Sequence, residues 1–117
     1  MTRALLEAAA KAMGLDLSWY EVGADETDEC LPGWYCEIAG TRRSWNPITD
    51  DGDCFRMETA LRLDGPHWLG ESVAYHGFSG GAETLMVERF ADHPNADAAR
   101  RMAATRAAAS LPPREGA

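Results

Sequence analysis

The amino-acid sequence predicts an α+β protein in which an antiparallel sheet is packed by helices. Three observations lead to this fold class: apolar residues at helical spacing in three segments, four segments typical of strands, and turn-forming residues between neighbouring strands. Antiparallel strands usually bury one face of their sheet under other elements. We therefore expect the order α-β-β-α-β-β-α, with one four-stranded antiparallel sheet in an α/β sandwich and helices on one or both of its faces.

The first half of the chain predicts one helix and two strands. Residues 3–13 carry apolar side chains at helical spacing, and Gly14 follows them as a C-terminal stop. Residues 15–22 are rich in aromatic and apolar side chains and predict a strand. Residues 34–39 alternate with period two and predict its neighbour. Residues 40–44 are expected to form a basic turn.

The next part of the chain predicts a second helix and a hairpin. Residues 49–53 supply an N-cap and first-turn acids for a helix that continues with an apolar stripe. Residues 64–70 are expected to form a connection. Residues 71–76 and 83–90 predict two strands, joined by a turn at 79–81.

A third helix is expected from the cap residue Asn95 to about Ser110. Its alanines form a small-residue face, and Pro112 and Pro113 end it. At 117 residues the chain is long enough to bury a core without staples. We expect one domain over residues 1–111 and a frayed tail over residues 112–117.

Charge and hydropathy exclude several classes of partner. The formal net charge is -8, and residues 21–64 hold eleven acidic side chains against four arginines. Such a field disfavours direct binding of nucleic acid or of an anionic membrane, so a charged partner should be basic. No apolar run approaches the roughly 20 residues that cross a bilayer. The N-terminus does not have the pattern of a signal peptide, and we expect a cytoplasmic location in a bacterial host cell.

Neither a cofactor nor a metal is predicted. The three cysteines are an odd number without a Cys-x-x-Cys pair, which favours reduced thiols, although a Cys30–Cys36 bridge stays open. The histidines show no metal-ligand spacing with them. An EF-hand alignment over the acids after Pro47 lacks its two leading ligands, so Asp50, Asp51 and Asp53 are interpreted as stabilising a helix N-terminus.

The most distinctive segment is Trp45-Asn46-Pro47-Ile48-Thr49-Asp50-Asp51-Gly52-Asp53. Its W-x-P-x-T-D pattern before a helix resembles small bacteriophage and prophage proteins of the phage ABA sandwich type. The helix-first order and the alanine-rich C-terminal helix add to the resemblance. It implies an α-β-α sandwich of phage origin and supplies no catalytic residues.

These observations predict a non-enzymatic binding protein. Cys54, the best-placed nucleophile, is crowded by acids, and the glycine-rich turn lacks the lysine of a phosphate loop. The first hypothesis is a phage-encoded inhibitor of a host defence complex, of anti-CRISPR type, whose acidic surface occupies a basic nucleic-acid-binding site on a host protein or nucleoprotein. The residues expected to carry it are Asp25, Glu26, Asp28, Glu29, Asp50, Asp51 and Asp53, with Trp34 or Trp45 as apolar anchors.

The alternative hypothesis is a phage structural, assembly or accessory protein that acts through self-association as a homodimer. Either the alanine-rich helix at 95–110 or an exposed edge strand would then form the contact.

Overall fold

The computed structural model describes residues 2–20, 33–38, 41–79 and 81–113. These residues form an α+β fold with helices α1 (Thr2–Ala12), α2 (Asp51–Leu61) and α3 (Ala96–Ala109). The first antiparallel sheet contains β1 (Leu17–Tyr20), β2 (Gly33–Ile38) and β3 (Thr41–Ser44). The second contains β4 (Asp64–Leu69), β5 (Ser72–Ser79) and β6 (Ala82–Arg89), followed by the 3-10 turn η1 (Phe90–Asp92).

The three predicted helices and the predicted β5–β6 hairpin are confirmed. Gly14 has a positive φ of 74°, which suits the predicted stop after α1. The side chain of Asn95 accepts a hydrogen bond from the backbone N of Ala98 at 2.8 Å, which caps α3 as expected. No helix in the described part of the chain is both long and apolar enough to span a bilayer.

The prediction of one four-stranded sheet is not confirmed, because two further strands divide the strands between two sheets. The expected basic turn at 40–44 contains β3, which pairs with β2 in a register that places Arg42 opposite Glu37. The expected connection at 64–70 contains β4, which pairs with β5. Pro66 lies in this edge strand, where a missing backbone N–H is tolerated.

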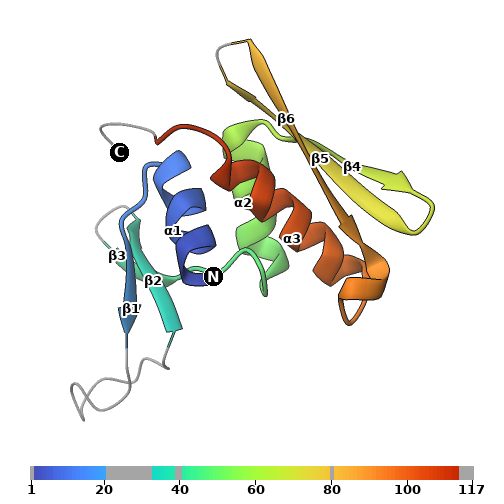
Figure 1. Ribbon diagram of the computed structural model, residues 1–117. Coiled ribbons are helices and arrows are strands. Elements are labelled where there is room, and N and C mark those ends of the chain that lie inside the picture. The colour runs from blue at the N-terminus through green and yellow to red at the C-terminus, as the bar shows by residue number, and fades with distance from the viewer. Residues whose placement is uncertain (1, 21–32, 39–40, 80, 114–117) are drawn as a thin grey trace.

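The helices lie between the two sheets, as Figure 1 shows, with β1, β2 and β3 on one side and β4, β5 and β6 on the other. This order differs from the α-β-α layers that the phage resemblance implies. The physical reason lies in α3, which packs against α1, α2 and the second sheet. A helix covered on several sides needs small or apolar residues around it, and the buried alanines of α3 meet that need: Ala99, Ala103, Ala104, Ala107 and Ala108.

The contact between α3 and β5 is close. A side chain at Gly77 would place its Cβ 3.1 Å from the carbonyl oxygen of Ala107. Small residues on both elements therefore let the helix approach the sheet. The alanine-rich helix is part of the core, so the prediction that it mediates self-association is not supported by its burial.

Candidate functional site

The predicted acids at the start of α2 stabilise the helix N-terminus. Asp50 is the N-cap, and its carboxylate accepts a hydrogen bond from the backbone N of Asp53 at 2.7 Å. The buried Asp53 accepts from the backbone N of Asn46 at 3.0 Å and from the Arg56 guanidinium at 2.6 Å. The interpretation of Asp50 and Asp53 as helix-stabilising acids is confirmed.

Asp51 faces two arginines of α3. Its carboxylate accepts hydrogen bonds from Arg101 at 2.7 Å and from Arg100 at 3.2 Å. These bonds, the one from Arg101 foremost, hold the pKa of Asp51 below its usual value. Asp51 is exposed, yet its charge is largely matched within the chain.

The other predicted partner-binding residues do not form a described surface. Trp45 is only 2% exposed and lies in the hydrophobic core, so it is not the exposed anchor that the sequence suggested. The core cluster that contains Trp45 also contains Leu6 of α1 and Met57 of α2, and this accounts for its burial. Trp34 lies on β2, but its side chain lies outside the described part. Asp25, Glu26, Asp28 and Glu29 also lie outside the described residues.

A polar cluster joins α2, α3 and β5 inside the fold. Arg100 donates to the Glu58 carboxylate at 2.9 Å and to the Tyr75 hydroxyl at 3.3 Å, while the Tyr75 hydroxyl donates to Glu58. Burial and the neighbouring Glu58 raise the pKa of Tyr75 above its usual range. Each polar group has a partner, so the arrangement suits a structural link between helices and sheet.

The described thiols are poor nucleophiles. Cys36 and Cys54 are both free and buried. Burial, with Asp53 as a smaller cause, raises the pKa of Cys36 to about 11. Burial and Glu58 raise the pKa of Cys54 to about 12. A thiol with a raised pKa stays protonated near neutral pH and lacks the reactive thiolate.

Among the described residues, no group of three or more histidine, cysteine or acidic side chains could hold a metal ion. The fold nevertheless brings two histidines together. The rings of His67 and His76 meet edge to face, with centroids 5.5 Å apart. His93 lies elsewhere and contacts Glu88 at 2.8 Å.

The second sheet has one face toward the helices and one face toward solvent. Tyr75 and Glu88 contact Arg100 and Arg106 of α3, so residues in phase with them form the inner face. Residues in the opposite phase form what we call the outer sheet face: His67, Leu69, Ser72, Ala74, His76, Phe78, Glu83, Leu85, Val87 and Arg89.

The outer sheet face exposes four large apolar side chains. The exposed fractions are 56% for Leu69, 52% for Phe78, 52% for Leu85 and 41% for Val87. Together they form an apolar surface over all three strands of the sheet. Scattered exposed apolar residues are normal, whereas several on one face indicate an interaction surface.

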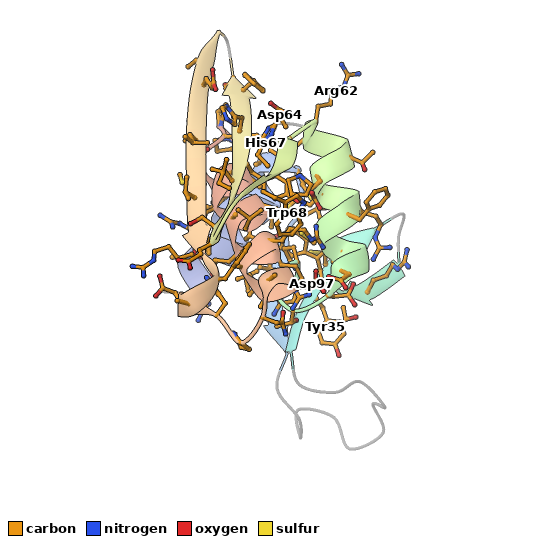
Figure 2. The ribbon with its side chains drawn as sticks, turned by 90° about the vertical axis from the view of Figure 1, so that its right-hand side faces the viewer. Tyr35, Arg62, Asp64, His67, Trp68 and Asp97 are labelled. Carbon is orange, nitrogen blue, oxygen red and sulfur yellow. The ribbon has the colours of Figure 1, made fainter. Side chains whose placement is uncertain are left out.

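An aromatic row crosses this face. His76 stacks on Phe78 with ring centroids 6.2 Å apart and contacts Glu83, while His67 pairs with Asp64 at 3.1 Å. Figure 2 views the molecule from this side and shows Arg62, Asp64, His67 and Trp68 in succession where the chain leaves α2 and follows β4. Polar partners therefore accompany the apolar side chains of the outer sheet face.

A shallow open pocket of about 470 Å³ adjoins Phe78. It lies between the ends of α1 and α2 and the segment at 111–113, and among the described residues of its lining Arg62 alone is charged. A small-molecule site normally combines enclosure with several converging polar groups. The described lining of this pocket provides neither, so we assign no separate site to it.

Sequence reasoning did not find the outer sheet face. It predicted both strands of the hairpin, but it assigned no role to the exposed apolar side chains on them. The available signal is the run Leu85-Met86-Val87, which places apolar side chains on both faces of β6. Both faces of such a strand are expected to pack against other residues, and the described residues pack against the inner face.

No protein-family model, no curated protein and no solved structure matches the chain. The function is therefore inferred from the geometry of the outer sheet face and from the charge of the chain.

Proposed function

We propose that this chain is a non-enzymatic protein-binding module and that the outer sheet face is its binding surface. The observation that carries the proposal is the group of four large apolar side chains exposed on one face of one sheet. A protein interface commonly has an apolar centre and a polar rim. Leu85 and Val87 lie centrally on β6, and the charged side chains of Glu83 and Arg89 flank them.

The interior of the molecule supports a binding role more than a catalytic one. The titratable groups of the polar cluster between the helices and the inner face, Glu58, Tyr75 and Arg100, satisfy one another and lie between packed elements. A catalytic site usually leaves a reactive group facing a cavity that admits substrate. The buried thiols of Cys36 and Cys54 have raised pKa values, which opposes nucleophilic activity.

A tagged-chain capture experiment tests the binding surface. The wild-type chain and the variant Leu85→Lys are each used to recover proteins from a bacterial lysate that also contains a second copy with a different tag. Leu85→Lys places a charge in the centre of the apolar surface, and we expect it to lose the bound protein.

Phe55→Lys provides the matched control, because Phe55 is 67% exposed on α2, which is not part of the outer sheet face. This variant should bind like the wild type. Recovery of the same proteins by Leu85→Lys and by the wild type would show that the outer sheet face is not the binding surface.

The acidic-inhibitor hypothesis remains a second candidate, favoured by the net charge of -8. In its narrow form the chain is a phage or prophage inhibitor that occupies a basic nucleic-acid-binding site. Asp50, Asp51 and Asp53 contribute less to it than expected, because capping bonds and arginines engage them. The remaining acids, Asp25, Glu26, Asp28 and Glu29, would have to supply most of the surface.

Salt separates this second candidate from apolar binding. Capture of a basic nucleic-acid-handling complex that is lost at high salt, and after Asp25, Glu26, Asp28 and Glu29 are neutralised, would support the acidic inhibitor. Capture that persists at high salt and depends on Leu85 would exclude it.

A further inference from the structure

The order of side chains along β6 gives the outer sheet face a direction. Because strand residues two apart share a face, Glu83, Leu85, Val87 and Arg89 form one row. The row begins with an acid, continues with two exposed aliphatic side chains and ends with a base. Arg89 is exposed and has no ion-pair partner among the described residues. Two antiparallel copies of this row therefore match in both charge and apolar character.

We propose that the outer sheet face binds the same face of a second copy of this chain, with the two β6 strands antiparallel. The proposal rests on the proposed function, since it names the partner of that surface. The two-fold axis runs between the stacked second sheets of the two copies, perpendicular to their strands, at the level of Met86. It places Glu83 against Arg89 of the second copy and Leu85 against Val87 of the second copy. Every contact then occurs twice, as in other isologous interfaces.

The same rotation also places residues of the central strand β5 against complementary residues of β5 in the second copy. Tyr75 pairs with Met86 in the sheet, so the axis passes at the level of both residues. The rotation therefore places Ser72 against Phe78 of the second copy, and His76 of the second copy over Ala74, which is itself only 1% exposed. In both pairs a small side chain meets a large one, which allows two sheets to pack at about the usual 10 Å separation.

Face-to-face stacking fits the apolar surface better than pairing of the two β6 edges. Edge pairing would join the same residues of β6, but it would leave Leu69 and Phe78 in water. Stacking covers both, because Leu69 lies beside Ser72 on the neighbouring strand and reaches the position of Phe78 of the second copy. Because Glu83 and Arg89 carry opposite charges, the row does not favour a partner surface that is only positive or only negative.

Sedimentation velocity over a series of protein concentrations tests the proposal. It is run at physiological ionic strength, because two chains of charge -8 repel each other strongly at low salt. We expect the wild type to dimerise. Glu83→Arg brings two arginines together and Arg89→Glu brings two glutamates together, so each should raise the dimer Kd by about tenfold or more.

Charge exchange and a matched control make the test specific. The double variant Glu83→Arg/Arg89→Glu restores opposite charges across the interface and should recover most of the association. Asp16→Arg makes the same change of charge as Glu83→Arg, in the link before β1 of the other sheet, and should leave the dimer unchanged. All these side chains are exposed, so thermal unfolding should show that each variant remains folded.

Phe78→Ser distinguishes stacked faces from paired edges, because it removes a contact that only stacking makes. A variant that dimerises like the wild type would overturn the stacked arrangement. A monomeric wild type would overturn self-binding. A double variant that stays monomeric while folded would overturn the pairing of Glu83 with Arg89 of the second copy.

A monomeric wild type that captures another protein through Leu85 would leave the proposed function standing and would reject only the second copy as its partner. A chain that shows neither self-association nor capture that depends on Leu85 would contradict both.

Discussion

The two faces of the second sheet both carry apolar side chains, but they differ in burial. On the inner face, Val73 and Tyr75 are fully buried against the helices, and the Tyr75 hydroxyl joins the cluster of Glu58 and Arg100. On the outer sheet face, Leu85 and Val87 of the adjacent strand face solvent. The comparison shows that the pattern along a strand identifies two faces but does not say which one the rest of the chain covers.

The polar groups that pack between the helices and the inner face also depend on one another. Glu58 and Arg100 are mostly buried, whereas Glu83 and Arg89 of the outer sheet face are accessible to water. Loss of one buried partner leaves the other unpaired in a poorly solvated place, whereas an exposed charge is solvated again. Substitutions on the two faces should therefore separate stability from binding.

The largest effect is expected from Arg100→Met, which leaves the buried Glu58 carboxylate without its cationic partner. We expect the free energy of unfolding to fall by about 3 kcal/mol, measured by chemical denaturation. Arg3→Met in the exposed Arg3–Glu7 pair is the control and should cost less than about 0.5 kcal/mol. A similar loss in both variants would contradict the structural role of the cluster.

The same substitution on each face of the sheet tests the comparison directly. Val73→Thr places a hydroxyl in the core and should lower the free energy of unfolding by about 2 kcal/mol. Val87→Thr on the outer sheet face should change it by less than about 0.5 kcal/mol in the monomer. Equal losses at a concentration where the chain is monomeric would show that both faces are covered.

Tyr75→Phe removes the hydroxyl but keeps the ring. Since Glu58 retains Arg100, the free energy of unfolding should fall by about 1.5 kcal/mol, less than for Arg100→Met. Chemical denaturation measures the difference. A loss as large as that of Arg100→Met would mean that the hydroxyl, and not the guanidinium, keeps Glu58 stable in the fold.

The smallest effect is expected from Asp51→Asn and depends on pH. The folded pKa of Asp51 is lowered by Arg101 and Arg100, so its contribution to stability is present above the unfolded carboxyl pKa and is lost as pH falls through the folded pKa. The melting temperature of the variant should be lower than that of the wild type at neutral pH and should converge with it in acid.

Asp16→Asn is the control for this pH dependence, because Asp16 is an exposed acid with no ion pair to a described side chain. A difference between Asp51→Asn and the wild type that persists unchanged in acid would contradict an origin in the Asp51–Arg101 pair.

The parts of the fold that sequence analysis predicted well are those with local signals. The stop of α1 at Gly14, the cap of α3 at Asn95 and the cap of α2 within residues 49–53 each involve residues a few positions apart. β3 and β4 were missed because a short edge strand is defined mainly by its neighbour. The Asp51–Arg101 contact joins residues 50 positions apart, which no local pattern indicates.

The amino-acid sequence by itself determined the α+β class, the three helices with their caps, the β5–β6 hairpin and the negative charge. Only the tertiary structure decided that the strands form two sheets around the helices, that Trp45 is buried and that the outer sheet face is open. The physical reason is that caps and periodicity act over a few residues, whereas burial depends on which distant element covers a face.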